Sequence, residues 1–132
     1  MGFMDRYRQA QEEGIHEQWQ TLNQEGQLNA IMELSHDKPQ IVFKHSTRCG
    51  ISSMAKHQLE HDWDLDADHA DMYYLDLIAH RDISNQIAEL TGVVHQSPQI
   101  ILIQNGKAVF DTSHHAISVA RIRAALDQTK AS

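Results

Sequence analysis

The sequence predicts an α/β protein with a mixed central sheet of four to five strands and helices on both faces. Short runs of β-branched and aromatic residues alternate along the chain with segments whose apolar residues recur at helical spacing. Towards the C-terminal end, two strand-like runs follow one another directly, joined by Asn105-Gly106, a dipeptide that favours a two-residue hairpin. Strands that alternate with helices imply parallel pairing, and the hairpin adds an antiparallel edge.

The N-terminal half contributes two strands and two helices after a polar extension. Residues 1–14 are rich in Gln and Glu, and we expect a loosely ordered extension or a short helix there. Residues 15–22 predict an edge strand or the lead-in to one, 27–35 a helix that ends before Pro39, and 40–44 a strand buried on both faces. A second helix begins near residue 50. The apolar residues expected to pack inward are Trp19, Leu22, Leu28, Ile31, Met32, Leu34, Ile51, Met54, Ala55 and Leu59.

The C-terminal half continues the alternation and ends with the hairpin and a helix. Asp82 is the expected N-cap of a helix that Gly92 closes. Strands are expected over 72–77, 99–103 and 107–111, and the last helix over 117–128. Inward-facing residues of the two helices are Ile83, Ile87, Leu90, Val119, Ile122, Ala125 and Leu126. The resulting order, (β)αβαβαββα, is that of the thioredoxin fold, and we expect residues 15–132 to form one such domain.

Composition narrows the classes of function. A chain of 132 residues fits one domain, and its net charge of −7 opposes a nucleic-acid or anionic-membrane partner, which would need clustered Lys and Arg. No segment approaches the roughly 18–20 apolar residues that span a bilayer, and residues 1–13 lack the features of a signal peptide. A single cysteine excludes an internal disulfide. We therefore expect a protein of a reducing compartment, the cytoplasm.

The position of Cys49 carries the strongest functional signal. It follows the carboxyl end of a predicted buried strand and opens a helix, and ligand sites in α/β sheets collect at the carboxyl ends of strands. A helix N-terminus supplies free N–H groups and partial positive charge, which stabilise a thiolate. Arg48 and Lys44 would lower the thiol pKa further, and Ser52 would contact the thiol or cap the helix. The polar flanks oppose the alternative of a small buried apolar residue, so Cys49 is the expected nucleophile.

Ser97-Pro98 is the second element of the predicted site. The proline opens a strand about fifty residues after the cysteine and cannot donate a hydrogen bond to the sheet. The matching order of elements favours a cis peptide bond over an ordinary trans bond at an edge strand. Pro98 would then lie against the cysteine loop, and the backbone of Ser97 would be free to pair with an extended substrate.

The segment Phe43 to Ser52, Phe-Lys-His-Ser-Thr-Arg-Cys-Gly-Ile-Ser, with Met54-Ala55 after it, resembles the YtxJ family of monothiol bacilliredoxins. The resemblance runs from about Trp19 to the last helix and includes Tyr74-Leu75-Asp76, the segment around Ser97-Pro98 and the Asn105-Gly106 hairpin. It implies a thioredoxin fold in which Cys49 reduces mixed disulfides between proteins and bacillithiol, a low-molecular-weight thiol.

The resemblance also implies roles for individual residues. Ser52 occupies the place of a resolving cysteine, Pro98 is the cis-proline, and Thr47 and Arg48 belong to the active-site loop. The family motif often has Pro after the cysteine where this chain has Gly50, which loosens the first helical turn and leaves the exact thiol pKa open.

With one sulfur, Cys49 would take over the thiol cap of a modified protein, and a second free thiol or an external thiol reductase would regenerate it. The expected partners are therefore S-thiolated proteins, a low-molecular-weight thiol and such a reductase, with no bound cofactor. Reversible capping of Cys49 as a sensor is a related role.

Ten histidines suggest further hypotheses. His57 and His61 share a helix face and could bind a metal ion with His69 or Asp71, but a solvated face is the simpler interpretation. We expect no metal site. His45 ends the strand before the cysteine loop, where it either tunes Cys49 or packs. The main alternative function is a thioredoxin-fold module that binds peptides, or senses redox state, without catalysis, and a histidine-based metal carrier is a third.

Overall fold

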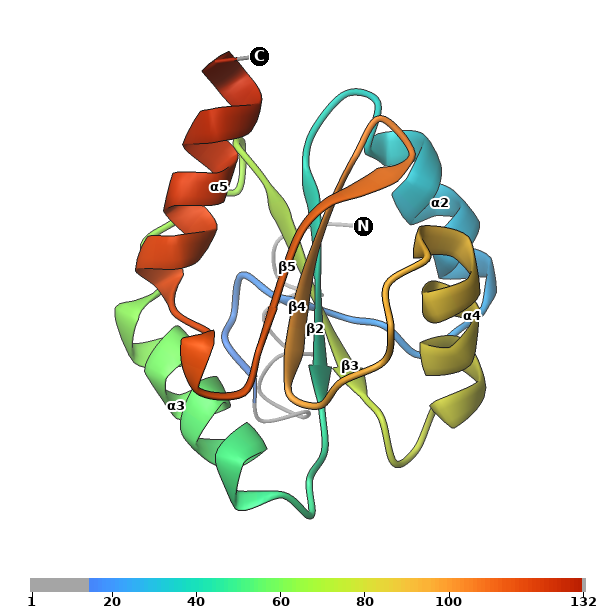
Figure 1. The fold of residues 1–132 in the computed structure, drawn as a ribbon, viewed down its shortest axis with the longest axis vertical. Helices are drawn as coiled ribbons and strands as arrows, with labels where there is room; N and C mark the ends of the chain where they lie inside the picture. Colours follow the sequence, from blue (N-terminus) through green and yellow to red (C-terminus); the bar gives the residue numbers. More distant parts are fainter. Residues whose placement is uncertain (1–14, 132) are drawn as a thin grey trace.

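The computed structural model describes residues 15–131, so the predicted extension over residues 1–14 lies outside the described part of the chain (Figure 1). The elements are β1 (Gln20–Thr21), α2 (Gly26–Leu34), β2 (Gln40–His45), α3 (Gly50–Asp62), β3 (Asp71–Asp76), α4 (Arg81–Thr91), β4 (Gln99–Gln104), β5 (Lys107–Ser113), the 3₁₀ turn η1 (His114–Ala116) and α5 (Val119–Ala131). This order of strands and helices is the one predicted from the sequence. None of the described helices is both long enough and apolar enough to cross a membrane.

The five strands form one mixed sheet in the order β1-β3-β2-β4-β5. β3 runs parallel to both β1 and β2, whereas β4 pairs antiparallel with β2 and β5 antiparallel with β4. The hairpin between β4 and β5 turns at Asn105 and Gly106, whose φ angles are 54° and 74°. Both angles are positive, as a type I′ turn requires. The sequence therefore predicted the mixed sheet and its antiparallel edge correctly.

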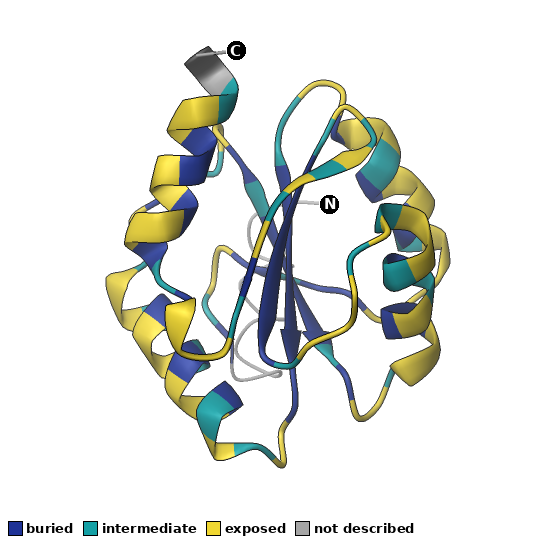
Figure 2. Cartoon of the chain, viewed as in Figure 1, coloured by how far each residue is buried: buried dark blue, intermediate teal, exposed yellow. Residues whose placement is uncertain are grey.

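Helices cover both faces of the sheet (Figure 1). α3 and α5 pack on one face through Ala55, Leu59, Val119 and Ile122, and α2 and α4 pack on the other. Every residue of β2 is buried, and Figure 2 shows the central strands as the buried middle of the domain. A strand that is buried on both faces explains the continuous apolar run in the sequence.

Three residues predicted to pack inward are exposed. Met54 is 60% exposed, because the buried positions of α3 are Ser52, Ala55 and Leu59, and a residue next to Ala55 points about 100° away from that stripe. Leu90 is 49% exposed beside the hollow between α2 and α4, and Leu34 is exposed at the end of α2.

The ends of α4 differ in how well they were predicted. His80 stands at the N-cap position, so Asp82 lies in the first turn and does not cap the helix. Its carboxylate is still favourable there, because it faces the positive end of the helix dipole. Gly92 closes α4 in the left-handed conformation, with a φ of 72°, as predicted.

Candidate active site

Cys49 lies in the loop between β2 and α3, at the carboxyl end of the strand. It occupies the N-cap position of α3 with an extended backbone, φ −112° and ψ 123°. Its side chain is partly exposed, and its neighbours Thr47, Arg48 and Gly50 are exposed. The Cys49 backbone N–H donates to the carbonyl oxygen of Ser46 at 3.1 Å, which closes a tight turn around the loop. The thiol is therefore accessible and held in a defined loop.

The buried side chain of Ser52 holds this loop through a hydrogen bond to its backbone. It is fully buried, and its hydroxyl oxygen accepts a hydrogen bond from the backbone N–H of Ser46 at 3.3 Å. Hydrogen bonding from the Ser52 backbone N–H is the largest cause that lowers the pKa of Cys49 below its ordinary value. Partial burial of the thiol acts in the opposite direction, while the Ile51 N–H and the Ser52 hydroxyl lower the pKa further. The first turn of α3 thus favours the thiolate.

Lys44 does not stabilise the Cys49 thiolate, contrary to the expectation from the sequence. Its side chain is on the α4 face of the sheet, where Nζ is 3.2 Å from the carbonyl oxygen of Ser84 and 3.3 Å from Nδ1 of His95. The groups that lower the Cys49 pKa are instead those of the first helical turn. The helix N-terminus, the first cause expected from the sequence, is therefore among the groups that lower the Cys49 pKa, whereas Lys44 and Arg48, expected to lower it further, are not.

His45 is packed beneath the site. It is 4% exposed, its Nδ1 is 2.9 Å from the hydroxyl of Tyr74, and its ring contacts that of Phe43 at a centroid distance of 5.7 Å. Burial lowers its pKa to about 4, with Lys56 acting in the same direction. His45 is therefore neutral near pH 7. Of its two predicted roles, the structure shows the packed one.

The Ser97-Pro98 peptide bond is cis, as expected from the sequence. Gln99 pairs with Lys44 near the carboxyl end of β2, so Pro98 lies at the end of the sheet from which the Cys49 loop leaves. The carbonyl oxygen of Pro98 accepts a hydrogen bond from the backbone N–H of His114 at 3.0 Å. η1 in turn lies beside α3. The cysteine loop, the Pro98 segment and η1 therefore gather at one end of the sheet.

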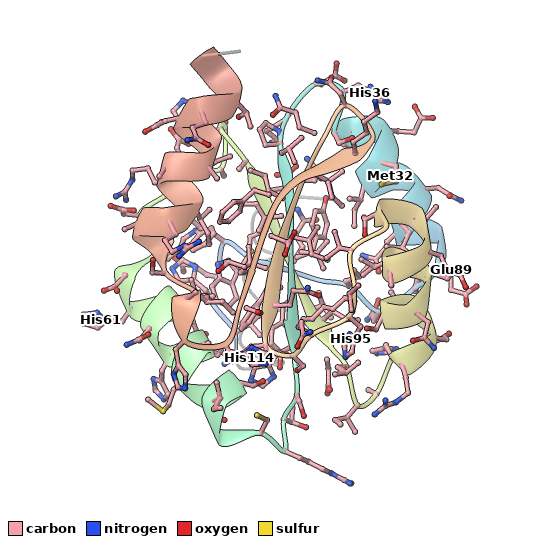
Figure 3. The ribbon with its side chains drawn as sticks, in the orientation of Figure 1. Met32, His36, His61, Glu89, His95 and His114 are labelled. Carbon is pink, nitrogen blue, oxygen red and sulfur yellow. The ribbon has the colours of Figure 1, made fainter. Side chains whose placement is uncertain are left out.

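Sequence reasoning missed several residues around this end. His114 has a left-handed backbone, with a φ of 54°, and lies at the end of β5 (Figure 3). Ser84 and His95 contact Lys44 from α4 and from the segment before β4. Tyr74 holds His45. No spacing or composition signal connects these residues, because each contact joins positions 11 to 51 residues apart or depends on the turn geometry.

The histidine hypothesis gains no support from the described residues. Across residues 15–131, no group of three or more His, Cys, Asp and Glu side chains could hold a metal ion. His57 and His61 are both exposed on α3, and His61 contacts the neighbouring Asp62.

Comparison with known families decides the assignment. A family model for the monothiol bacilliredoxin BrxC matches residues 20–122, most of the chain. The chain belongs to the monothiol bacilliredoxin family. The matched region runs from β1 into α5 and includes Cys49 and the Ser97-Pro98 segment. The resemblance seen in the sequence is thereby confirmed.

Solved structures share the thioredoxin fold of this chain. A protein assigned as an oxidoreductase with a thioredoxin fold is 33% identical, with a TM-score of 0.68, and the match covers 82% of this chain and 93% of that protein. The thioredoxin Mala s 13 of Malassezia sympodialis is 22% identical over 83% of this chain and 89% of its own, with a TM-score of 0.63. The thioredoxin of Trypanosoma brucei brucei is 16% identical over 86% and 92%, with a TM-score of 0.66. The last two show the thioredoxin fold, and family and fold together support a redox function as a thiol oxidoreductase.

Proposed function

We propose that this bacilliredoxin removes bacillithiol, or a similar low-molecular-weight thiol, from protein mixed disulfides through Cys49. The observation that carries the proposal is the accessible Cys49 thiol at the start of α3, whose pKa the first helical turn lowers. Because a thiolate is the attacking species in thiol–disulfide exchange, a lowered pKa raises its fraction near neutral pH.

The exchange needs only one sulfur of the enzyme. The Cys49 thiolate attacks the cap sulfur of the mixed disulfide, a new S–S bond forms between Cys49 and the cap, and the old S–S bond breaks. The substrate protein leaves as a thiolate and takes up a proton. A second low-molecular-weight thiol, or an external thiol reductase, then attacks the capped Cys49 and releases it. Overall, one S–S bond replaces another: when the second thiol is a low-molecular-weight thiol, it is oxidised to a disulfide with the cap while the substrate protein recovers its free thiol.

The presence of Ser52 in place of a second cysteine supports a monothiol mechanism. It stands three residues after Cys49, where a second cysteine could form an intramolecular disulfide, and the chain has a single cysteine. A hydroxyl cannot resolve the mixed disulfide, so the capped enzyme waits for an outside thiol. This cycle requires a pool of reduced thiol, as the cytoplasm provides.

The substrate protein would dock along the Ser97-Pro98 segment. Pro98 is buried and its carbonyl oxygen is engaged by η1, while Ser97 is partly exposed. An extended peptide can pair with backbone groups at such a position. The exposed Thr47, Arg48 and Gly50 would flank the cap on the opposite side.

The experiment is cap transfer followed by mass spectrometry. The protein is mixed under native conditions with a substrate protein that carries a bacillithiol cap, and with a second one that carries a glutathione cap. We expect one cap mass on Cys49 and an equal amount of uncapped substrate. Cys49→Ser should abolish both, and Ser53→Ala, on the exposed side of the same turn, should abolish neither. An unmodified Cys49 that is labelled only after denaturation would contradict the proposal, and partner binding without transfer would favour a binding module.

A further inference from the structure

A buried ammonium group lies on the α4 face of the sheet. Lys44 is 0% exposed, and its hydrogen-bond partners among residues 15–131 are the Ser84 carbonyl oxygen and Nδ1 of His95. No carboxylate of the described residues lies within ion-pair distance of it. Burying a charge without a counter-ion is unfavourable, and burial accordingly lowers the pKa of Lys44 to about 8. An aliphatic side chain would fill this place without that cost, so a specific use of the ammonium group is indicated.

The ammonium group contacts the segment that leads to Pro98. Figure 3 shows His95 on the chain between α4 and β4, on the α4 side of the sheet. Nδ1 of His95 is 3.3 Å from the Ser84 hydroxyl as well as 3.3 Å from Lys44 Nζ. Partial burial of the ring lowers the pKa of His95, and the positive charges of Lys44 and Arg81 lower it further. A neutral His95 can therefore accept a hydrogen bond from the Lys44 ammonium near pH 7.

Gln99 holds the same segment from the neighbouring strand. Its side-chain amide donates to the carbonyl oxygen of Val94 at 3.0 Å, and its side-chain oxygen accepts from the backbone N–H of Gln96 at 3.3 Å. Gln99 and Lys44 are paired residues of β4 and β2, so their side chains share one face of the sheet. Two buried polar side chains thus hold residues 94–96 just before Ser97-Pro98.

We propose that Lys44 is a positioning residue for the substrate groove: through His95 it sets the position of the 94–98 segment, and hence the affinity for the mixed-disulfide substrate. The inference rests on the proposed function in assigning this groove to the substrate. It gives Lys44 a role separate from the thiol, since the first turn of α3 already stabilises the Cys49 thiolate. Lys44 would therefore affect KM and leave the reactivity of Cys49 unchanged.

Variants of His95 test this without disturbing the core, because His95 is exposed and lies outside the helices and strands. His95→Asn keeps an acceptor atom at the same number of bonds from Cα as Nδ1, whereas His95→Leu removes it. We expect His95→Leu to raise KM for a capped substrate protein by about fivefold or more, with kcat and the Cys49 pKa unchanged. His95→Asn should stay within about twofold of the wild-type KM.

Lys44→Met, alone and combined with His95→Leu, tests the role of the lysine directly. Lys44→Met should raise KM as His95→Leu does, and the double variant should show no further increase, because both changes remove one contact. Lys38→Met is the matched control, since Lys38 contacts Asp71 and Ala67 at the opposite end of β2 and should leave KM unchanged. A KM for His95→Leu within twofold of wild type, or a fall in kcat with KM unchanged, would overturn the positioning role.

Amide hydrogen exchange separates this inference from the proposed function. The backbone N–H of His114 donates to the Pro98 carbonyl oxygen, so its exchange rate reports on the position of Pro98 without any activity. We expect it to rise by about tenfold in His95→Leu and to stay at the wild-type rate in His95→Asn. Unchanged exchange in His95→Leu would contradict the positioning role, whereas a wild-type protein that removes no cap but shows the expected exchange pattern would contradict only the proposed function.

Discussion

His45 makes the stability of the fold sensitive to acid. In the folded protein its pKa is lowered to about 4, chiefly because the ring is buried under the cysteine loop. In the unfolded chain the same ring would titrate near its ordinary value of about 6.5. Between these values the unfolded state binds a proton that the folded state does not, so the free energy of unfolding falls as the pH falls. Below about pH 4 both states hold the proton and this contribution stops changing.

The magnitude follows from the two pKa values. A pKa of about 4 in place of 6.5 corresponds to about 3 kcal/mol, since one pKa unit is worth about 1.4 kcal/mol. Urea unfolding followed by circular dichroism at pH 7, 5.5 and 4.5 measures the loss. His45→Gln is the comparison, because Gln is neutral throughout and the other histidines with lowered pKa values, His16 and His95, remain.

We expect the wild type to lose about 2–3 kcal/mol more than His45→Gln between pH 7 and pH 4.5. Parallel curves for the two proteins would refute the reasoning, because they would show that His45 titrates alike in the folded and unfolded states.

Three further outcomes test other parts of the structure. Gly50→Pro should raise the free energy of unfolding, measured by urea titration, by about 0.5–1 kcal/mol. Cys49 already has the extended backbone that a residue before proline adopts, and residue 50 is the first residue of α3, where proline is tolerated. A loss of stability would show that the backbone at residue 50 does not accept proline. Ser35→Ala should cost about 1–3 kcal/mol and leave the activity per folded molecule unchanged, because the buried Ser35 hydroxyl accepts from Gly106 N–H at 2.9 Å far from Cys49. Ser52→Ala removes the hydroxyl but keeps the backbone N–H that lowers the Cys49 pKa most, so it should raise that pKa slightly and slow alkylation of the thiol at pH 7; an unaltered alkylation rate would contradict the contribution of the hydroxyl.

The order of elements was predictable because local signals and burial agree. β2 and β4 are buried on both faces and therefore read as continuous apolar runs. Asn105, Gly106 and Gly92 have positive φ angles, and Asn and Gly are the residue types that adopt such angles most readily, so these turns could be predicted. The errors arose where periodicity does not say how wide the covered stripe is. Met54 and Leu90 have helical spacing but lie just outside the area that the sheet covers.

The site was predictable at Cys49 and Pro98 and less so around them. Both positions follow from the order of strands and helices, which determines what lies at the carboxyl end of β2. Lys44 was misplaced because a strand with every residue buried gives no indication of which face a side chain occupies. His114 was missed because β5 extends two residues beyond its predicted end, and its contact with Pro98 depends on that extension.

The pKa of Cys49 tests the central claim most directly. Thiolate absorbance near the ultraviolet edge is followed against pH for the native protein, with Cys49→Ser as the reference that removes the signal of every other group. A transition below the ordinary thiol value of about 8.5 is the result that the first turn of α3 predicts. A transition at or above that value would mean that the helix N-terminus does not prime the sulfur, and the assignment of Cys49 as the exchanging nucleophile would fail.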